Sequence, residues 1–294
     1  MRTINAINNK RDFVDHVQAR QDSYTIVYRK LANYLINNFV EVAFMRAQQW
    51  AAAVETSEVS VIRFVRFLGY KGYPEFAEKI RQILRNEMTM TEYAELSVKT
   101  GRKGTDILMD IIKAEERNFN ELVAKYSPET MSEAVDLLGK TDRIVVLGLR
   151  SSAALAEYCG YMLVRALAKE VITITHGDSS AFDTFLPWEN KTVLVIAFGY
   201  PRYPNRTLEI LEYAKNLKWP IVSVTSDELS PLVPLSDLVI YAPSHSVAFT
   251  DSMGAASVII NTMILEYTHK FHDTSIDKIK RFETLAKEKK YYWG

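Results

Sequence analysis

Five short apolar runs rich in valine and isoleucine follow one another in the second half of the chain. They read RIVVLGL, VITIT, TVLVIAF, PIVSVT and DLVIYAP, and the first begins after Asp142. Segments with helical spacing lie among them, at 152–168, 205–218 and 252–270. Strands that are apolar on both faces and alternate with helices are typical of a parallel sheet covered on both sides. This half is therefore expected to be an α/β domain with a doubly wound parallel sheet.

Polar residues follow the first three of these predicted strands. In a doubly wound sheet the ligand crevice lies beyond the carboxyl ends of the strands. Serine hydroxyls, guanidinium groups and the free N–H groups at the start of a helix all favour an anion, and arginine suits a phosphate or a carboxylate. The candidate ligand-binding residues are Gly148, Arg150, Ser151, Ser152, His176, Ser179 and Arg202.

Four of these candidates have a plainer interpretation. Ser151 and Ser152 fit the cap of the helix that follows them. His176 fits a polar loop, and Arg202 fits an ion pair with an acidic side chain. The chain lacks G-x-G-x-x-G, a Walker lysine and a G-x-S-x-G elbow, and its five histidines lack the usual metal-ligand spacing. We therefore expect no cofactor and no metal.

A helix-turn-helix pattern occupies residues 47–76, AQQWAAAVETSEVSVIRFVRFLGYKGYPEF. Ser57 is a ready N-cap for its second helix. At about 100° per residue, one side of this helix carries Val61, Phe64, Val65 and Leu68, and the other carries Val59, Arg63 and Arg66. One apolar face and one basic face are what the recognition helix of a helix-turn-helix needs in a major groove.

The basic face predicts contacts with double-stranded DNA. We expect base or phosphate contacts from Arg63 and Arg66, with Val59 on the same face. The full predicted set is Ser57, Val59, Ser60, Arg63, Arg66 and Lys71. A solvated helix face is the alternative. Trp50, Phe64 and Phe67 are expected in the core rather than stacked on bases.

Charge and pattern divide the 294 residues into three parts. Residues 1–90 hold 13 Lys and Arg against 9 Asp and Glu, a net charge of +4, while the whole chain is neutral. We expect a helix-turn-helix domain at 1–87, a helical linker at 88–128 and a ligand-binding domain at 129–294. No element is predicted for the polar residues 1–22. In the linker, KTGRKGT is expected to break the helical pattern, and Ser127 to cap a helix opened by Pro128.

Several features predict a cytoplasmic protein. No apolar run reaches the roughly 18–20 residues of a membrane span. The amino terminus, MRTINAINNKRDFVDHV, lacks the apolar core of a secretion signal. The single cysteine, Cys159, sits in an apolar helical pattern and is expected to be a buried thiol. The final residues, KEKKYYWG, are expected to form a solvated tail.

The two halves together resemble the RpiR family of bacterial transcription regulators. Ser57, Arg63, Phe64, Leu68, Gly69, Gly72 and Phe76 match its S-x-x-x-x-x-R-F-x-x-x-L-G-x-x-G-x-x-x-F pattern. The resemblance implies an amino-terminal helix-turn-helix and a carboxyl-terminal SIS (sugar isomerase) domain. Gly148, Ser151 and Ser152 fit the first phosphosugar loop of such domains. The second loop, usually S-x-S-G-x-T, reads GYPRYPNRT here, so the resemblance implies an acidic or phosphorylated sugar derivative met by Arg202.

Three functions are compatible with these patterns. The first is a DNA-binding regulator that senses a small anionic carbohydrate derivative and acts as a homodimer or homotetramer on a palindromic operator, without membrane contact. The second is a sugar-phosphate isomerase with an accessory helical domain, for which His176, Asp178 or Asp251 is a candidate base. The third is a binding module without DNA. We favour the first, a sensor rather than an enzyme.

Overall fold

The computed structural model describes residues 9–293, with the exception of 88, 90, 93, 96–103, 189–190 and 248–249. The chain divides into two compact units, residues 1–111 with 247–250 and residues 112–246 with 251–294. Most of KTGRKGT, the break expected in the linker, lies outside the described residues.

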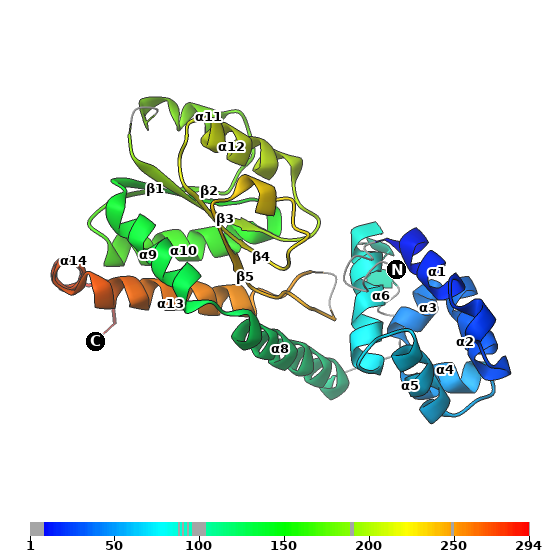
Figure 1. Cartoon of the computed structure of the whole chain (residues 1–294). Helices are drawn as coiled ribbons and strands as arrows, with labels where there is room; N and C mark the ends of the chain where they lie inside the picture. Colours follow the sequence, from blue (N-terminus) through cyan, green and yellow to red (C-terminus); the bar gives the residue numbers. More distant parts are fainter. Residues whose placement is uncertain are drawn as a thin grey trace. The chain divides into compact units, whose positions relative to one another are not determined.

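The first unit is built from short helices (Figure 1). They pack around an aromatic core. Trp50 stacks on Phe76 with ring centroids 5.4 Å apart, and Phe64 meets Trp50 edge-on at 6.0 Å. Such aromatic contacts add to the stabilisation from burial alone. In chain order the helices are α1 (Lys10–Gln18), the 3-10 turn η2 (Gln21–Ser23), α2 (Ile26–Asn37), α3 (Phe39–Phe44), α4 (Ala47–Ala53), α5 (Glu58–Phe67) and α6 (Tyr73–Glu87).

Helix α1 was not predicted from the sequence. It is polar on most sides, but Phe13 and Val17, four residues apart, are fully buried. Asn9 caps it by accepting a hydrogen bond from the Asp12 N–H at 2.8 Å. Phe13 contacts Phe39 with ring centroids 5.2 Å apart, so tertiary packing accounts for a helix that its own composition barely favours.

The second unit contains a five-stranded, fully parallel sheet of order β2-β1-β3-β4-β5. The predicted α/β class is confirmed, and each strand forms at one of the five apolar runs, although β2 begins one residue before its run and β3 ends one residue after it. β1 pairs with β3 from Arg143 opposite Val193 to Gly148 opposite Phe198. The strands are β1 (Arg143–Gly148), β2 (Glu170–Ile174), β3 (Val193–Gly199), β4 (Ile221–Thr225) and β5 (Leu238–Tyr241).

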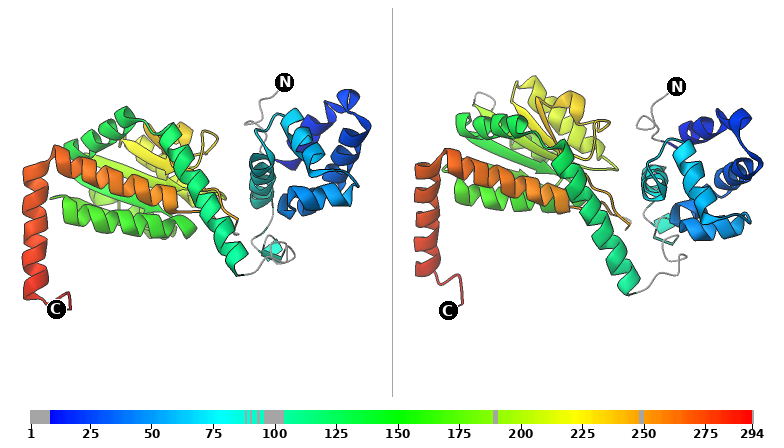
Figure 2. Two further views of the ribbon diagram at one scale, coloured as in Figure 1. Left: turned by 90° about the horizontal axis from the view of Figure 1, so that it is seen from below. Right: turned by 60° about the horizontal axis from the view of Figure 1, so that its bottom comes forward.

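Helices cover both faces of this sheet, as its apolar strands require. Ile144 and Val146 of β1 join a core with α9 (Pro128–Lys140), α10 (Ala153–Ala166) and α13 (Gly254–Lys270). On that face α13 lies between α9 and α10 (Figure 2). Val145 and Leu147 face a second core with α11 (Ser180–Asp183) and α12 (Asn205–Asn216). The remaining elements are α8 (Thr105–Lys125), α14 (His272–Glu288) and the 3-10 turns η3 (Arg150–Ser152), η4 (Leu186–Trp188) and η5 (Val233–Leu235).

Several local predictions are confirmed in this unit. Ser127 caps α9 by accepting a hydrogen bond from the Thr130 N–H at 3.1 Å, and Pro128 is its first residue. Cys159 is buried. The expected tail is only partly irregular, because α14 continues to Glu288 and the exposed Tyr291, Tyr292 and Trp293 follow it. Among the described helices, none is long and apolar enough to cross a membrane.

Candidate functional site

Helix α5 has a defined start and a defined end. The Ser57 hydroxyl accepts a hydrogen bond from the Ser60 N–H at 3.2 Å, which confirms the predicted cap. At the other end, Gly69 adopts a φ of 107°. Its N–H donates to Arg66 O at 2.9 Å, and the Tyr70 N–H donates to Val65 O at 3.1 Å. This is a Schellman stop, which favours glycine at the left-handed position.

One face of α5 is locked into the core of the first unit. Val61, Phe64, Val65 and Leu68 are fully buried, as predicted. The expectation for Phe67 was wrong, because 39% of its surface is exposed. It lies at the edge of the core, where its ring meets Tyr28 at 5.3 Å. Because this face is fixed, the side chains opposite it have a defined direction.

That opposite face carries the predicted DNA-contacting residues. Arg63 and Arg66 are both exposed, Val59 is 56% exposed, and Ser60 is half-buried beside the cap. The Arg66 Nε donates to Lys71 O at 3.3 Å, and the Lys71 N–H donates to Glu75 Oε2 at 2.5 Å. Arg66 is therefore tied to the turn that carries the exposed Lys71 side chain, so two cations are held at the carboxyl end of α5.

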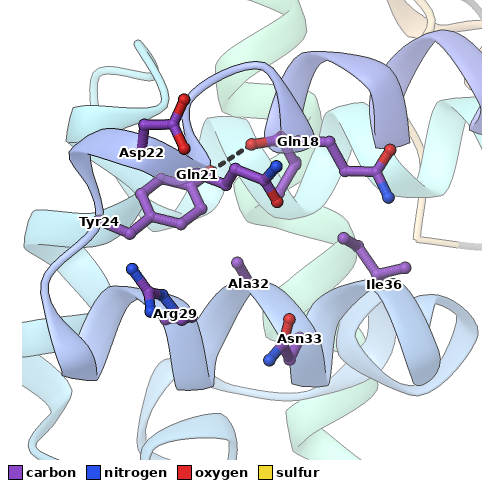
Figure 3. Close-up of a pocket in the computed structure, with 9 residues that line it drawn as sticks. Gln18, Gln21, Asp22, Tyr24, Arg29, Ala32, Asn33 and Ile36 are labelled. Carbon is purple, nitrogen blue, oxygen red and sulfur yellow. Dashed lines mark hydrogen bonds between the residues drawn. The ribbon is translucent and has the colours of Figure 1, made fainter.

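A cavity of about 340 Å³ also lies in the first unit, between α1 and α2 (Figure 3). Gln18, Asp22, Arg29 and Asn33 are among the side chains that line it. The Tyr24 hydroxyl closes one side by donating to Val17 O at 2.5 Å, and its ring packs on Phe64 of α5 with centroids 5.7 Å apart. The Tyr24 ring thus lies between this cavity and Phe64 of α5.

In the second unit, the sheet order reverses between β1 and β3, where a doubly wound fold forms its ligand crevice. The loop after β1 turns sharply there. A Cβ added at Gly148 would lie 2.4 Å from Ser152 O, so a side chain at 148 would displace the loop. Arg150 takes a left-handed φ of 58° and is exposed with Ser151.

Ser152 precedes α10 but does not cap it. Its side chain is 3% exposed and makes no capping hydrogen bond to the described first turn of that helix. The capping interpretation of Ser152 is therefore wrong. Its ligand-binding role stays a prediction, as does that of Ser151.

The loop after β2 meets the loop after β1 and the first turn of α12. A Cβ added at Gly177 would lie 3.0 Å from Leu149 Cδ1 and 2.8 Å from Arg206 Cγ, so these three segments touch at the same edge of the sheet. His176 and Ser179 are exposed in the loop after β2. The expected meeting of the loops after β1 and β2 is confirmed, and α12, which begins directly after the loop that follows β3, lies beside them.

Two candidate bases of the isomerase alternative differ in their surroundings. His176 is exposed, and its Nδ1 lies 3.1 Å from Thr175 Oγ1. Asp178 accepts hydrogen bonds from the Ser180 hydroxyl and N–H, and these bonds lower the pKa of its carboxyl group. A lowered pKa makes Asp178 a weaker base, which disfavours it as the proton acceptor of an isomerase.

The loop after β3 replaces the usual serines with two tyrosines and an arginine. Arg202 is exposed. Tyr200 is 4% exposed, and no hydrogen bond from the described residues reaches its hydroxyl. Burial raises the pKa of Tyr200, and the charge of Asp251 raises it further, so the phenol is a neutral donor at this edge of the sheet.

The sequence prediction missed a group of hydroxyls after β4. Tyr203 OH lies 3.3 Å from Ser226 Oγ. The Thr225 hydroxyl donates to Gly199 O at 2.7 Å and lies 2.8 Å from Ser230 Oγ, which joins the ends of β3 and β4. The run TSDELS begins at the last residue of this strand, so the criterion applied to the first three strands would have found it. Among the described residues, no group of His, Cys, Asp and Glu is arranged to hold a metal.

Comparison with known proteins agrees with both units. Residues 12–87 match the model of the helix-turn-helix domain of the rpiR family, and residues 137–266 match that of the SIS domain. The chain thus joins a helix-turn-helix DNA-binding domain to a parallel-sheet SIS domain. This combination defines the class of the chain as a two-domain regulator. The chain belongs to the RpiR family.

Relatives support this assignment along nearly the whole chain. An uncharacterized HTH-type transcriptional regulator of Thermotoga maritima is 22% identical over 288 residues, which span 95% of this chain and 100% of the relative. The sugar isomerase domain of an RpiR transcription factor from Sphaerobacter thermophilus superposes with a TM-score of 0.57 at 21% identity, covering 60% of this chain and 98% of that domain. The NanR protein of Vibrio vulnificus, complexed with ManNAc-6P, gives 0.51 at 17% identity, covering 93% and 97%. These two solved structures share the fold of the parts of this chain that they cover.

Proposed function

We propose that the chain is a DNA-binding transcriptional regulator that reads its operator with α5. The observation that carries this proposal is the direction of Arg63 and Arg66. Both guanidinium groups are exposed on a capped helix whose other face is fully buried. The amino end of the same helix carries Ser57, Val59 and Ser60. In helix-turn-helix proteins, residues at the amino end of the recognition helix contact base edges. Lys71 meets the phosphate backbone.

The second unit binds an anionic carbohydrate derivative at the edge of the sheet where β1 and β3 end. The proposed contacts are Gly148, Arg150, Ser151, Ser152, His176, Ser179 and Arg202. Arg150 and Arg202 supply positive charge, and the hydroxyls supply donors, which together suit a phosphate or a carboxylate. That the similar NanR structure holds a sugar phosphate agrees with this class of effector. The effector is bound and not converted.

The protein acts in the cytoplasm as a symmetric homodimer. The dimer forms through the outer face of α10 and α13. Large apolar side chains on this face are exposed, with Tyr161 at 52%, Val164 at 48% and Leu265 at 56%. The Tyr158 hydroxyl donates to Asn261 Oδ1 at 2.6 Å, so the two helices present one surface. Contiguous exposed apolar groups mark interaction sites, and a dimer matches a palindromic operator.

Selection from random duplex DNA with the full chain at low salt tests the DNA-binding part. We expect enrichment of a palindromic sequence, and binding to it that weakens steeply as salt is raised. Failure of any duplex to be retained above background would refute the proposal.

Thermal melting with a panel of sugar phosphates and sugar acids tests the effector part. A ligand that binds only the native protein raises the melting temperature. We expect stabilisation by at least one anionic sugar and by none of the neutral parent sugars. NMR of the same mixtures checks for isomerised product, and turnover would favour the isomerase alternative instead.

A further inference from the structure

Helix α8 holds both ends of the segment between β5 and α13. At the start of the segment, Asn118 Nδ2 donates to His245 O at 2.9 Å, and Asn118 Oδ1 accepts from the His245 N–H at 2.9 Å. At its end, a Cβ added at Gly254 would lie 2.5 Å from Glu115 Oε2, which shows how closely α8 approaches the start of α13. The two α8 residues, Asn118 and Glu115, are three positions apart, about one turn of the helix.

The hydrogen bonds of Asn118 are well suited to a permanent attachment. Its side chain is fully buried, and it satisfies the backbone donor and the backbone acceptor of one residue 127 positions away. A buried polar group left without a partner is destabilising. Separation of the segment from α8 at His245 would break both hydrogen bonds together and would require water to enter a buried position.

A second side-chain contact reinforces the attachment one turn further along α8. His245 Nε2 lies 2.7 Å from Glu121 Oε2, and Arg117 lies 3.4 Å from Glu121 Oε1. Burial opposes the ionisation of Glu121, but His245 and Arg117 outweigh it and lower the pKa of this carboxyl group to about 2. Glu121 is thus an anion throughout the physiological range, held between two partners.

The segment held in this way belongs to the edge of the sheet where the effector is proposed to bind. The Ser252 N–H donates to Ser244 O at 3.2 Å, and both serines are buried. Asp251 lies close enough to raise the pKa of Tyr200 in the loop after β3. The Ala242 N–H, at the start of this segment, donates to Thr225 O at 2.8 Å, and the Thr225 hydroxyl donates to Gly199 O at 2.7 Å. The segment that α8 holds is therefore joined by hydrogen bonds to the end of β3, from which the Tyr200 loop continues.

Helix α8 is also the element in which the chain passes between the two units, since the boundary falls between Ile111 and Ile112. We propose that Asn118, Glu121 and His245 form a coupling clamp, through which the state of the effector crevice and the state of the DNA-binding unit influence each other. The proposal rests on the proposed function. Coupling between two sites is reciprocal, so DNA bound at α5 must alter the segment between β5 and α13.

Hydrogen exchange of the full chain, with and without the duplex obtained by selection, tests the clamp without any effector. The variants are Asn118→Ala, which removes both backbone bonds, and Glu121→Gln, which keeps the shape but removes the charge. The matched control is Glu170→Gln, which breaks the Arg143–Glu170 pair (2.8 Å) at the opposite edge of the sheet. DNA affinity of each variant is measured in parallel by fluorescence anisotropy, which also reports that the first unit is folded.

In the natural chain and in Glu170→Gln, we expect DNA to change the exchange rate of the segment between β5 and α13 by about fivefold or more, the lower end of typical couplings. In Asn118→Ala the change is abolished, and in Glu121→Gln it is reduced, while DNA still binds. A response that persists in Asn118→Ala, or that is missing from the natural chain although DNA binds, overturns the clamp and leaves the regulator intact. Absence of DNA binding in every variant overturns the regulator itself.

Discussion

Replacement of the two arginines of α5 by alanine separates reading of bases from contact with phosphates. Arg63 lies nearer the amino end of the helix, the part that contacts base edges in helix-turn-helix proteins. Arg66 lies in the last turn, and its Nε is tied to Lys71 O. We therefore expect Arg63 to read a base and Arg66 to contact phosphate.

The two roles predict different losses of affinity. A base contact is worth about 1–3 kcal/mol per arginine. A symmetric dimer has two such contacts, so Arg63→Ala costs at least about 2 kcal/mol on the selected duplex, roughly thirtyfold, with little loss on unrelated DNA. Each phosphate contact contributes about 0.9 to the salt slope. Arg66→Ala therefore weakens binding to all duplexes and lowers the slope by about 2 per dimer.

Fluorescence anisotropy titrations over a range of salt concentrations measure both quantities. Lys287→Ala is the control, because this exposed cation lies on α14 of the second unit. Its affinity and salt slope should match those of the natural chain. If both arginine variants bind the selected duplex as the natural chain does, α5 is not the reading helix and the reasoning is refuted.

Three further predictions concern stability and reactivity. Ser57→Ala removes the cap of α5 and costs about 1 kcal/mol, a fall of roughly 4–8 °C in the melting temperature of the first unit by circular dichroism, whereas Ser57→Thr should melt nearly as before. The pKa of Glu121 is about 2 against 4.5 for the free group, so its stabilisation is present above pH 4.5 and is lost as the pH falls toward 2. The difference in urea midpoint between the natural chain and Glu121→Gln should therefore shrink over that range; a constant difference would contradict the shift. Burial raises the pKa of the Cys159 thiol, so iodoacetamide should modify it only after unfolding, and rapid labelling of the native chain would argue against a buried site.

Local patterns predicted the elements that carry their own signal. The strands were evident because each is apolar on both faces, and α5 because Ser57, Gly69 and the spacing of Val61, Phe64, Val65 and Leu68 agree. Helix α1 gave no such signal, since only Phe13 and Val17 are buried in it and their partners lie elsewhere in the chain. Phe67 was misjudged because helical spacing does not show where a core ends.

The candidate sites divide in the same way. The basic face of α5 and the convergence of the strand-end loops follow from spacing and topology, and both were predicted. The attachment of Asn118 to His245 was not, because it joins residues 127 positions apart through backbone groups that every residue has. No sequence pattern distinguishes that asparagine from others on the exposed side of a helix; only the fold brings it to its partner.

The central claim is that an anion bound in the second unit alters the affinity of α5 for DNA. The most direct measurement titrates the full chain onto the selected duplex with and without the sugar phosphate or sugar acid that most raises its melting temperature. We predict a change in Kd of between roughly fivefold and 150-fold, with DNA altering the affinity for that sugar by the same factor. Identical DNA affinities at a saturating concentration of a sugar that demonstrably binds would contradict the account.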